Sequence, residues 1–117
     1  MDFLKSLKIV EDDCLKILKN INLKKFKNSR VLVLGGNSFL ASYIQYVLFL
    51  ANQKQNLNCR VFSCSKNKPK FLLQSIIKRD KKFSFKKINL DRIGKNKIFF
   101  NKNYDFIFFC VTYGQPA

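Results

Sequence analysis

Apolar residues along this chain form two kinds of run. Short continuous runs, rich in β-branched and aromatic residues, predict strands buried on both faces, and longer runs with an apolar side predict helices. The predicted strands cover residues 30–34, 59–64, 83–90 and 104–111. The predicted helices cover 10–21, 38 to about 52, and 69 to about 79, with a weakly patterned loop at 91–103.

Strands and helices therefore alternate along most of the chain. This order is typical of α/β proteins, in which helices connect the strands of a parallel sheet. We expect residues 1–29 to form an N-terminal helical extension and residues 30–117 to form the sheet domain. With 117 residues, the chain has room for one small domain.

Helix ends and faces follow from local signals. The acids at 11–13 are expected in the first turn of the first helix, where they favour the helix dipole, and Pro69 is expected to open the third. The second helix is apolar on more than one side, so we expect neighbours to cover several of its sides. Its main buried face is predicted to contain Leu40, Ile44, Val47, Leu48 and Ala51.

Charge and composition limit the possible partners. The formal net charge is +16, and residues 66–103 contain most of the excess lysine. Lys, Asn, Ile and Phe, all abundant here, are the residues of A- and U-only codons, so compositional drift explains much of this charge. A nucleic-acid partner is therefore not favoured, although a basic polyanion-binding module on 66–103 stays as an alternative.

Membrane and export signals are absent from the sequence. No apolar run reaches the roughly 18 residues that a membrane span requires. The first residues place acids where a signal peptide needs an apolar core. We therefore expect a cytoplasmic protein with no membrane partner.

Cysteine and histidine usage excludes several kinds of site. The chain has four cysteines without a C-x-x-C pair and no histidine, which excludes Cys/His zinc sites and Ser-His or Cys-His nucleophilic systems within this chain. No metal ligands are predicted. Cys59, Cys64 and Cys110 lie in or beside predicted strands, where buried thiols are expected.

One motif indicates ligand chemistry. The stretch RVLVLGGNSFLASYI places a buried strand directly before a glycine-rich turn that opens a helix. Gly35 permits a tight turn whose backbone N–H groups can approach a pyrophosphate, and the helix beginning near Ser38 directs its positive end at that anion. This context is the one that a dinucleotide-binding motif requires.

The same residues resemble a known family. VLVLGGNSFLASYI is similar to the VLITGGxGFLGSxL signature of the extended short-chain dehydrogenase/reductases, the NAD-dependent epimerase/dehydratase family. YDFIFFCVTYGQPA resembles that family's fourth strand and the loop after it, and the likeness covers residues 9–117. It is strongest to UDP-glucuronate decarboxylase-like and dTDP-glucose 4,6-dehydratase-like proteins. The resemblance implies a Rossmann-like sheet that binds NAD, with NADP as the alternative cofactor.

The resemblance also implies a set of cofactor-binding positions. They are Gly35, Asn37, Ser38, Phe39, Leu40, Ser65, Lys66, Asn89, Leu90, Cys110, Val111 and Thr112. The chain departs from the family at several of them. Ser38 and Ala41 replace the second and third glycines, Ser65 with its neighbours replaces the ribose-binding Asp, and Phe109 replaces a His.

Family members are longer, and their catalytic Ser/Thr and Tyr-x-x-x-Lys follow the fourth strand. We therefore expect this chain to be an N-terminal fragment without catalytic residues and without turnover of its own. The complete enzyme is expected to be a homodimer that acts on a nucleotide sugar by transient hydride transfer to NAD. A vestigial fragment that binds nothing is the remaining alternative.

Overall fold

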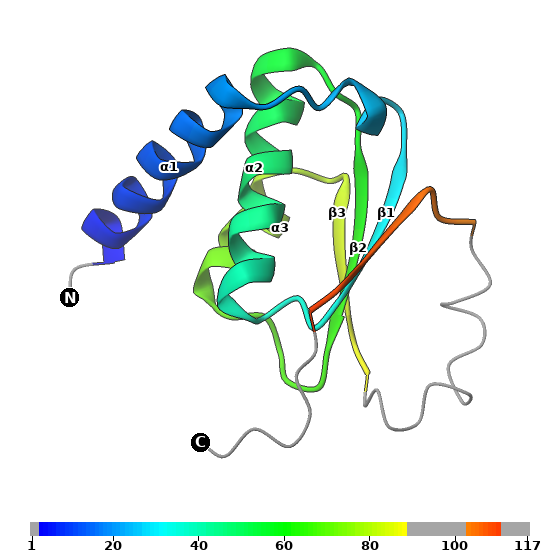
Figure 1. Cartoon of the computed structure of the whole chain (residues 1–117). Helices are drawn as coiled ribbons and strands as arrows, with labels where there is room; N and C mark the ends of the chain where they lie inside the picture. Colours follow the sequence, from blue (N-terminus) through cyan, green and yellow to red (C-terminus); the bar gives the residue numbers. More distant parts are fainter. Residues whose placement is uncertain (1–2, 89–102, 111–117) are drawn as a thin grey trace.

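The computed structural model describes residues 3–88 and 103–110, and within them the protein contains a four-stranded, all-parallel sheet of order β3-β2-β1-β4 (Figure 1). The strands are β1 (Arg30–Leu34), β2 (Arg60–Ser65), β3 (Phe83–Lys87) and β4 (Phe106–Phe109). The helices are α1 (Phe3–Asn20), α2 (Phe39–Gln55) and α3 (Phe71–Arg79), with a 3-10 turn, η1, at Lys24–Phe26. The predicted α/β class is confirmed, and the strand order is consistent with a Rossmann-like fold.

Strand positions agree closely with the sequence pattern, whereas two helix starts do not. The prediction for β1 is confirmed, and β2 is displaced by one residue. Helix α1 begins at Phe3, so the expected start at residue 10 is wrong, and the acids at 11–13 lie in the middle of the helix. Pro69 does not open α3, because Lys70 is its N-cap and Phe71 its first residue.

The main core lies between the sheet and the helices, all of which lie on one face of the sheet in Figure 1. Every α2 residue from 45 to 51 is buried, which confirms that this helix is covered on several sides. Leu40 is an exception to the predicted buried face, because it is 63% exposed. It borders an apolar hollow of about 290 Å³ between α1, α2 and Phe108, so no neighbouring element covers its side chain there.

Two acids in the middle of α1, which the sequence pattern predicted at its start, form hydrogen bonds with α2. The Tyr46 hydroxyl donates to Glu11 Oε1 (3.3 Å), and the Tyr43 hydroxyl donates to Asp13 Oδ2 (3.2 Å). Arg79 of α3 donates to the same Tyr46 oxygen (2.9 Å). The three helices thus share one polar network, which explains why acids interrupt the middle of α1.

Strand β4 pairs with β1 and has apolar side chains on both faces. Phe106 and Phe108 pack towards the helices, and the Phe106 ring lies 4.3 Å from the ring of Phe26 between centroids. On the opposite face, Ile107 and Phe109 are 60% and 59% exposed. Continuous apolar sequence with exposed side chains at a sheet edge is a template for association with other chains.

We predict that Ile107→Lys reduces self-association, because a lysine on an apolar edge strand opposes strand pairing between molecules. Ile9→Lys, at another exposed apolar position on α1, is the matched control for the added charge. Sedimentation velocity over a concentration series should show less association for I107K than for I9K. Equal behaviour of the two variants would contradict the role assigned to β4.

Candidate functional site

The glycine turn lies at the carboxyl edge of the sheet, at the lower end of the strands in Figure 1. The loop after β2 and the end of β4 reach the same edge, since all four strands are parallel. Strand β1 has β2 on one side and β4 on the other, so the chain runs outward from β1 through β2 to β3 and then returns to the opposite side of β1. In open α/β sheets such a switch point leaves a crevice where ligands bind.

Two glycines set the path of the turn. Gly35 has φ of 81°, a left-handed conformation that favours glycine. The N–H groups of Gly35 and Gly36 both donate to the Cys64 carbonyl, at 2.9 and 3.0 Å. At Gly36 an added Cβ would overlap the Ser63 hydroxyl, so the turn can lie against β2 only because this residue has no side chain.

A buried amide of α2, which the sequence analysis missed, forms a hydrogen bond with the backbone of the turn. Gln45 of α2 is fully buried, and its Nε2 donates to the carbonyls of Gly36 (3.0 Å) and Ala41 (3.1 Å). Gln45 Oε1 and Ser63 Oγ are buried without a hydrogen-bond partner among the described residues. An isolated amide within the apolar helix was the only sequence signal for this role.

The first turn of α2 presents backbone donors at this edge. Ser38 is the N-cap, and its Oγ accepts from the N–H of Ala41 at 3.2 Å. The serine at the second glycine position therefore satisfies one helical donor. The N–H groups of Phe39 and Leu40 precede the first intrahelical bonds, and no described residue accepts from them. These two donors, at the positive end of the helix, can bind an anion.

Asn37 joins the glycine turn to the loop after β2. Its Nδ2 donates to the carbonyls of Asn67 (3.2 Å) and Lys68 (2.9 Å), and its Oδ1 accepts from the N–H of Lys70 (2.9 Å). These bonds hold Asn37 beside the loop after β2. Its side chain acts as a loop connector in this structure.

The end of β2 lacks the carboxylate that would accept hydrogen bonds from a ribose. Ser65, the last residue of β2, is partly exposed, and Lys66 beside it is exposed. No Asp or Glu occurs between residues 29 and 79 of the sequence. This part of the crevice is therefore neutral to positive, and it would not repel a 2′-phosphate.

The remaining predicted positions divide into two groups. Cys110 directly follows β4, and its N–H donates to the Leu34 carbonyl at 2.8 Å, which places it at the same edge as the turn. Asn89, Leu90, Val111 and Thr112 lie outside the described residues.

The cysteines are free thiols, and burial raises their pKa values. Cys64 lies next to the turn, where burial raises its pKa to about 11 in spite of the hydrogen bond from the Gly35 backbone. A thiol with this pKa is a poor nucleophile at neutral pH. The burial expected of Cys59 and Cys64 is confirmed, whereas Cys110 is only partly buried.

Residues 3–88 and 103–110 contain no cluster of three or more His, Cys, Asp or Glu side chains that could hold a metal ion. The helices of this part of the chain include none with the length and apolarity of a membrane span.

Comparison of the chain with protein-family models, with curated proteins and with solved structures finds no match. The geometry of the glycine turn is therefore the main guide to function.

We predict that Gly36→Ala destabilises the fold by ~1–3 kcal/mol, because the new methyl group overlaps the Ser63 hydroxyl. Ser63→Ala alone should change stability by less than about 1 kcal/mol, since that hydroxyl has no partner among the described residues. In the double variant part of the loss should be recovered. Urea unfolding of all four proteins measures this coupling, and strictly additive effects would refute the contact.

Burial also predicts an order of thiol reactivity. With iodoacetamide at pH 8, Cys110 should react first. Burial raises the pKa values of Cys14 and Cys64 to about 12 and 11, so these two thiols should react only after unfolding. Peptide mass spectrometry of the alkylated protein tests this order, and rapid alkylation of native Cys64 would contradict it.

The same thiols predict how stability depends on pH. Because Cys14 and Cys64 ionise more easily in the unfolded chain, the free energy of unfolding should fall as pH rises from 9 towards 11. Urea melts over this pH range measure the fall.

Proposed function

We propose that this chain binds a nicotinamide dinucleotide at the glycine turn, with NAD as the cofactor and NADP as the alternative. The pyrophosphate would lie at the first turn of α2, and the adenosine ribose beside Ser65 and Lys66. The observation that carries the proposal is the pair of N–H groups at Phe39 and Leu40, from which no described residue accepts, in the first turn of a capped helix that begins at the carboxyl edge of the sheet.

Several other features support this fit. Gly36 and the Gln45 amide fix the turn before any ligand arrives, so the donors are preorganised. Ala41 at the third glycine position is fully buried, in keeping with close helix–strand packing there. The absence of a carboxylate near Ser65 and the positive charge of Lys66 beside it favour NADP over NAD.

The resemblance to nucleotide-sugar epimerases, dehydratases and decarboxylases supplies the wider proposal. In such an enzyme this chain would be the dinucleotide-binding part, and the cofactor would supply hydride transfer to and from the sugar. The residues here would bind and orient that cofactor, while proton transfer would need groups that this chain lacks. We propose a cytoplasmic location, because four free cysteines suit a reducing compartment.

The backbone donor itself can be removed by a substitution. Phe39 is the first residue of α2, a position where proline is tolerated, and Ser38 before it has the extended conformation that proline requires. Phe39→Pro deletes one N–H group and should weaken NADH and NADPH binding about tenfold or more, as expected for a hydrogen bond to a charged group. Quenching of the dinucleotide fluorescence measures both affinities.

Phe39→Ala is the matched control, because it removes the same exposed ring and keeps the N–H group. Its affinity should stay within about threefold of the unaltered chain, a smaller loss than one charged hydrogen bond causes. Circular dichroism and thermal unfolding of both variants show whether α2 is intact. Equal losses in folded F39P and F39A, or no binding of either dinucleotide by the unaltered chain, would overturn the proposal.

A second substitution tests the position of the ribose. Ser65→Asp places a carboxylate at the end of β2, where it would accept from ribose hydroxyls and repel a 2′-phosphate. The ratio of NADH to NADPH affinity should rise about tenfold, as expected for one charge repelling a phosphate a few ångströms away. Ser65→Asn, which has similar size without the charge, is the control. An unchanged ratio in S65D would show that the ribose does not lie beside β2.

A further inference from the structure

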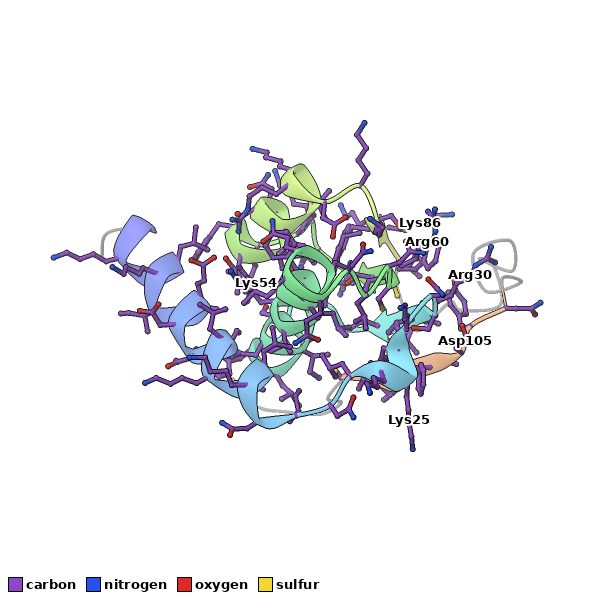
Figure 2. The ribbon with its side chains drawn as sticks, turned by 90° about the horizontal axis from the view of Figure 1, so that it is seen from above. Lys25, Arg30, Lys54, Arg60, Lys86 and Asp105 are labelled. Atoms are coloured by element: carbon purple, nitrogen blue, oxygen red, sulfur yellow. The ribbon has the colours of Figure 1, made fainter. Side chains whose placement is uncertain are left out.

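Two arginines lie side by side at the amino edge of the sheet, the edge opposite the glycine turn. Arg30 opens β1, Arg60 opens β2, and the two are direct register partners. Adjacent strands are about 4.8 Å apart, and both side chains are exposed. In Figure 2, which looks down on this edge, Arg30 and Arg60 extend to the side of the sheet away from α2.

This arrangement does not stabilise the fold. Like charges on neighbouring strand positions repel each other. Neither guanidinium has a carboxylate partner among the described residues. Neither takes part in the hydrogen bonds that join Arg79, Tyr46 and Glu11. One acid lies beside Arg30: Asp105, whose Oδ2 accepts from the backbone N–H of Arg30 at 2.8 Å. The pair therefore has the composition of an anion site, since guanidinium groups bind phosphate oxygens in paired hydrogen bonds.

Further cations lie at the same edge, on other sides of the molecule. Lys25 lies in η1, which three residues separate from β1, and Lys54 lies in the last turn of α2 on the helix side of the sheet (Figure 2). Lys82 precedes β3, and its carbonyl accepts from the N–H of Val61, beside Arg60. Positive charge at this edge is thus spread over several elements, which is wider than one small phosphate ligand needs.

Aromatic rings lie next to the arginines on the face of the sheet away from the helices. Phe62 is two residues after Arg60 on the same face of β2, and its ring meets that of Tyr104 edge to face at 5.5 Å. Arg30 is close enough to Tyr104 to oppose the effect of burial, which raises the pKa of that phenol. Both rings are partly exposed. Cations beside partly exposed rings form the combination that binds single-stranded nucleic acids.

We propose that the amino edge of the sheet is a binding site for single-stranded nucleic acid, with Arg30 and Arg60 on the phosphodiester backbone and bases stacked beside Phe62 and Tyr104. Residues 66–103, the lysine-rich segment that contributes most of the net positive charge, are not the centre of this site. The surface is assembled from strand starts that are far apart in the sequence. It is independent of the dinucleotide proposal, because it lies at the other end of the strands.

A labelled oligothymidine is the probe, and fluorescence anisotropy over a salt series is the measurement. The Arg30→Gln/Arg60→Gln protein should bind at least tenfold more weakly at low salt, and its salt slope should be less steep by about 1.4, the value for two lost phosphate contacts. Lys5→Gln/Lys8→Gln removes the same charge from exposed positions near the start of α1 and should bind within about threefold of the unaltered chain, in line with non-contacting charges.

Two further measurements distinguish binding at this site from binding by the overall positive charge of the protein. Asp105→Asn keeps an acceptor for the Arg30 N–H and removes a negative charge beside Arg30, so affinity should rise about twofold or more in a variant that circular dichroism shows to be folded. An abasic strand of the same length should bind at least fivefold more weakly, because stacking is lost.

Other outcomes would overturn the proposal. These are equal losses in the arginine and lysine variants, equal affinity for the abasic strand, or equally tight binding of polyglutamate or of anionic lipid vesicles. Phe39→Pro should leave oligonucleotide binding unchanged, so the failure of either proposal can be recognised without reference to the other.

Discussion

The close approach of the glycine turn to β2 is the contact on which the carboxyl edge of this protein depends. Gly36 lies against the Ser63 side chain, and no residue with a Cβ fits there without displacement. That approach lets both glycine N–H groups reach the Cys64 carbonyl and lets Gln45 hold the Gly36 carbonyl from the helix side. Strand, turn and helix are consequently fixed to one another, and the first turn of α2 has a defined direction.

Parallel strands give the sheet two chemically different ends. At the carboxyl edge, helix starts and backbone N–H groups gather, and they attract anions without using side-chain charge. At the amino edge, helix ends and strand starts gather, and here side chains such as Arg30 and Arg60 provide the charge. One topology therefore supports the two anion-binding surfaces proposed above, which would act through different groups and need not interfere.

Four of the seven acidic residues of the chain form structural hydrogen bonds. Glu11 and Asp13 accept from tyrosines of α2, Asp80 accepts from the backbone of Lys82, and Asp105 accepts from the backbone of Arg30. Their hydrogen bonds attach a helix, close a turn and join a strand pair. The excess positive charge is left at the surface, where its effect depends on which cations the fold brings together.

The sequence by itself determined the elements with strong local signals. The apolar run of β1, the glycine turn after it and the apolar α2 were predicted from residue spacing alone, because burial on two faces and a positive φ leave direct marks on residue choice. The same signals located Gly35, Asn37, Ser38, Phe39 and Leu40 at one edge. They also explain why the α/β class was predicted correctly.

The tertiary structure decided what depends on partners distant in the chain. The acids of α1 were interpreted as a helix start, because their partners Tyr43 and Tyr46 lie some thirty residues away. Gln45 and Ser63 gave no recognisable motif, since their role exists only where α2, the turn and β2 meet. Arg30 and Arg60 are likewise unremarkable in sequence and become neighbours only through the strand register. Local patterns record burial and backbone conformation, whereas contacts between distant segments are fixed only when the sheet is assembled.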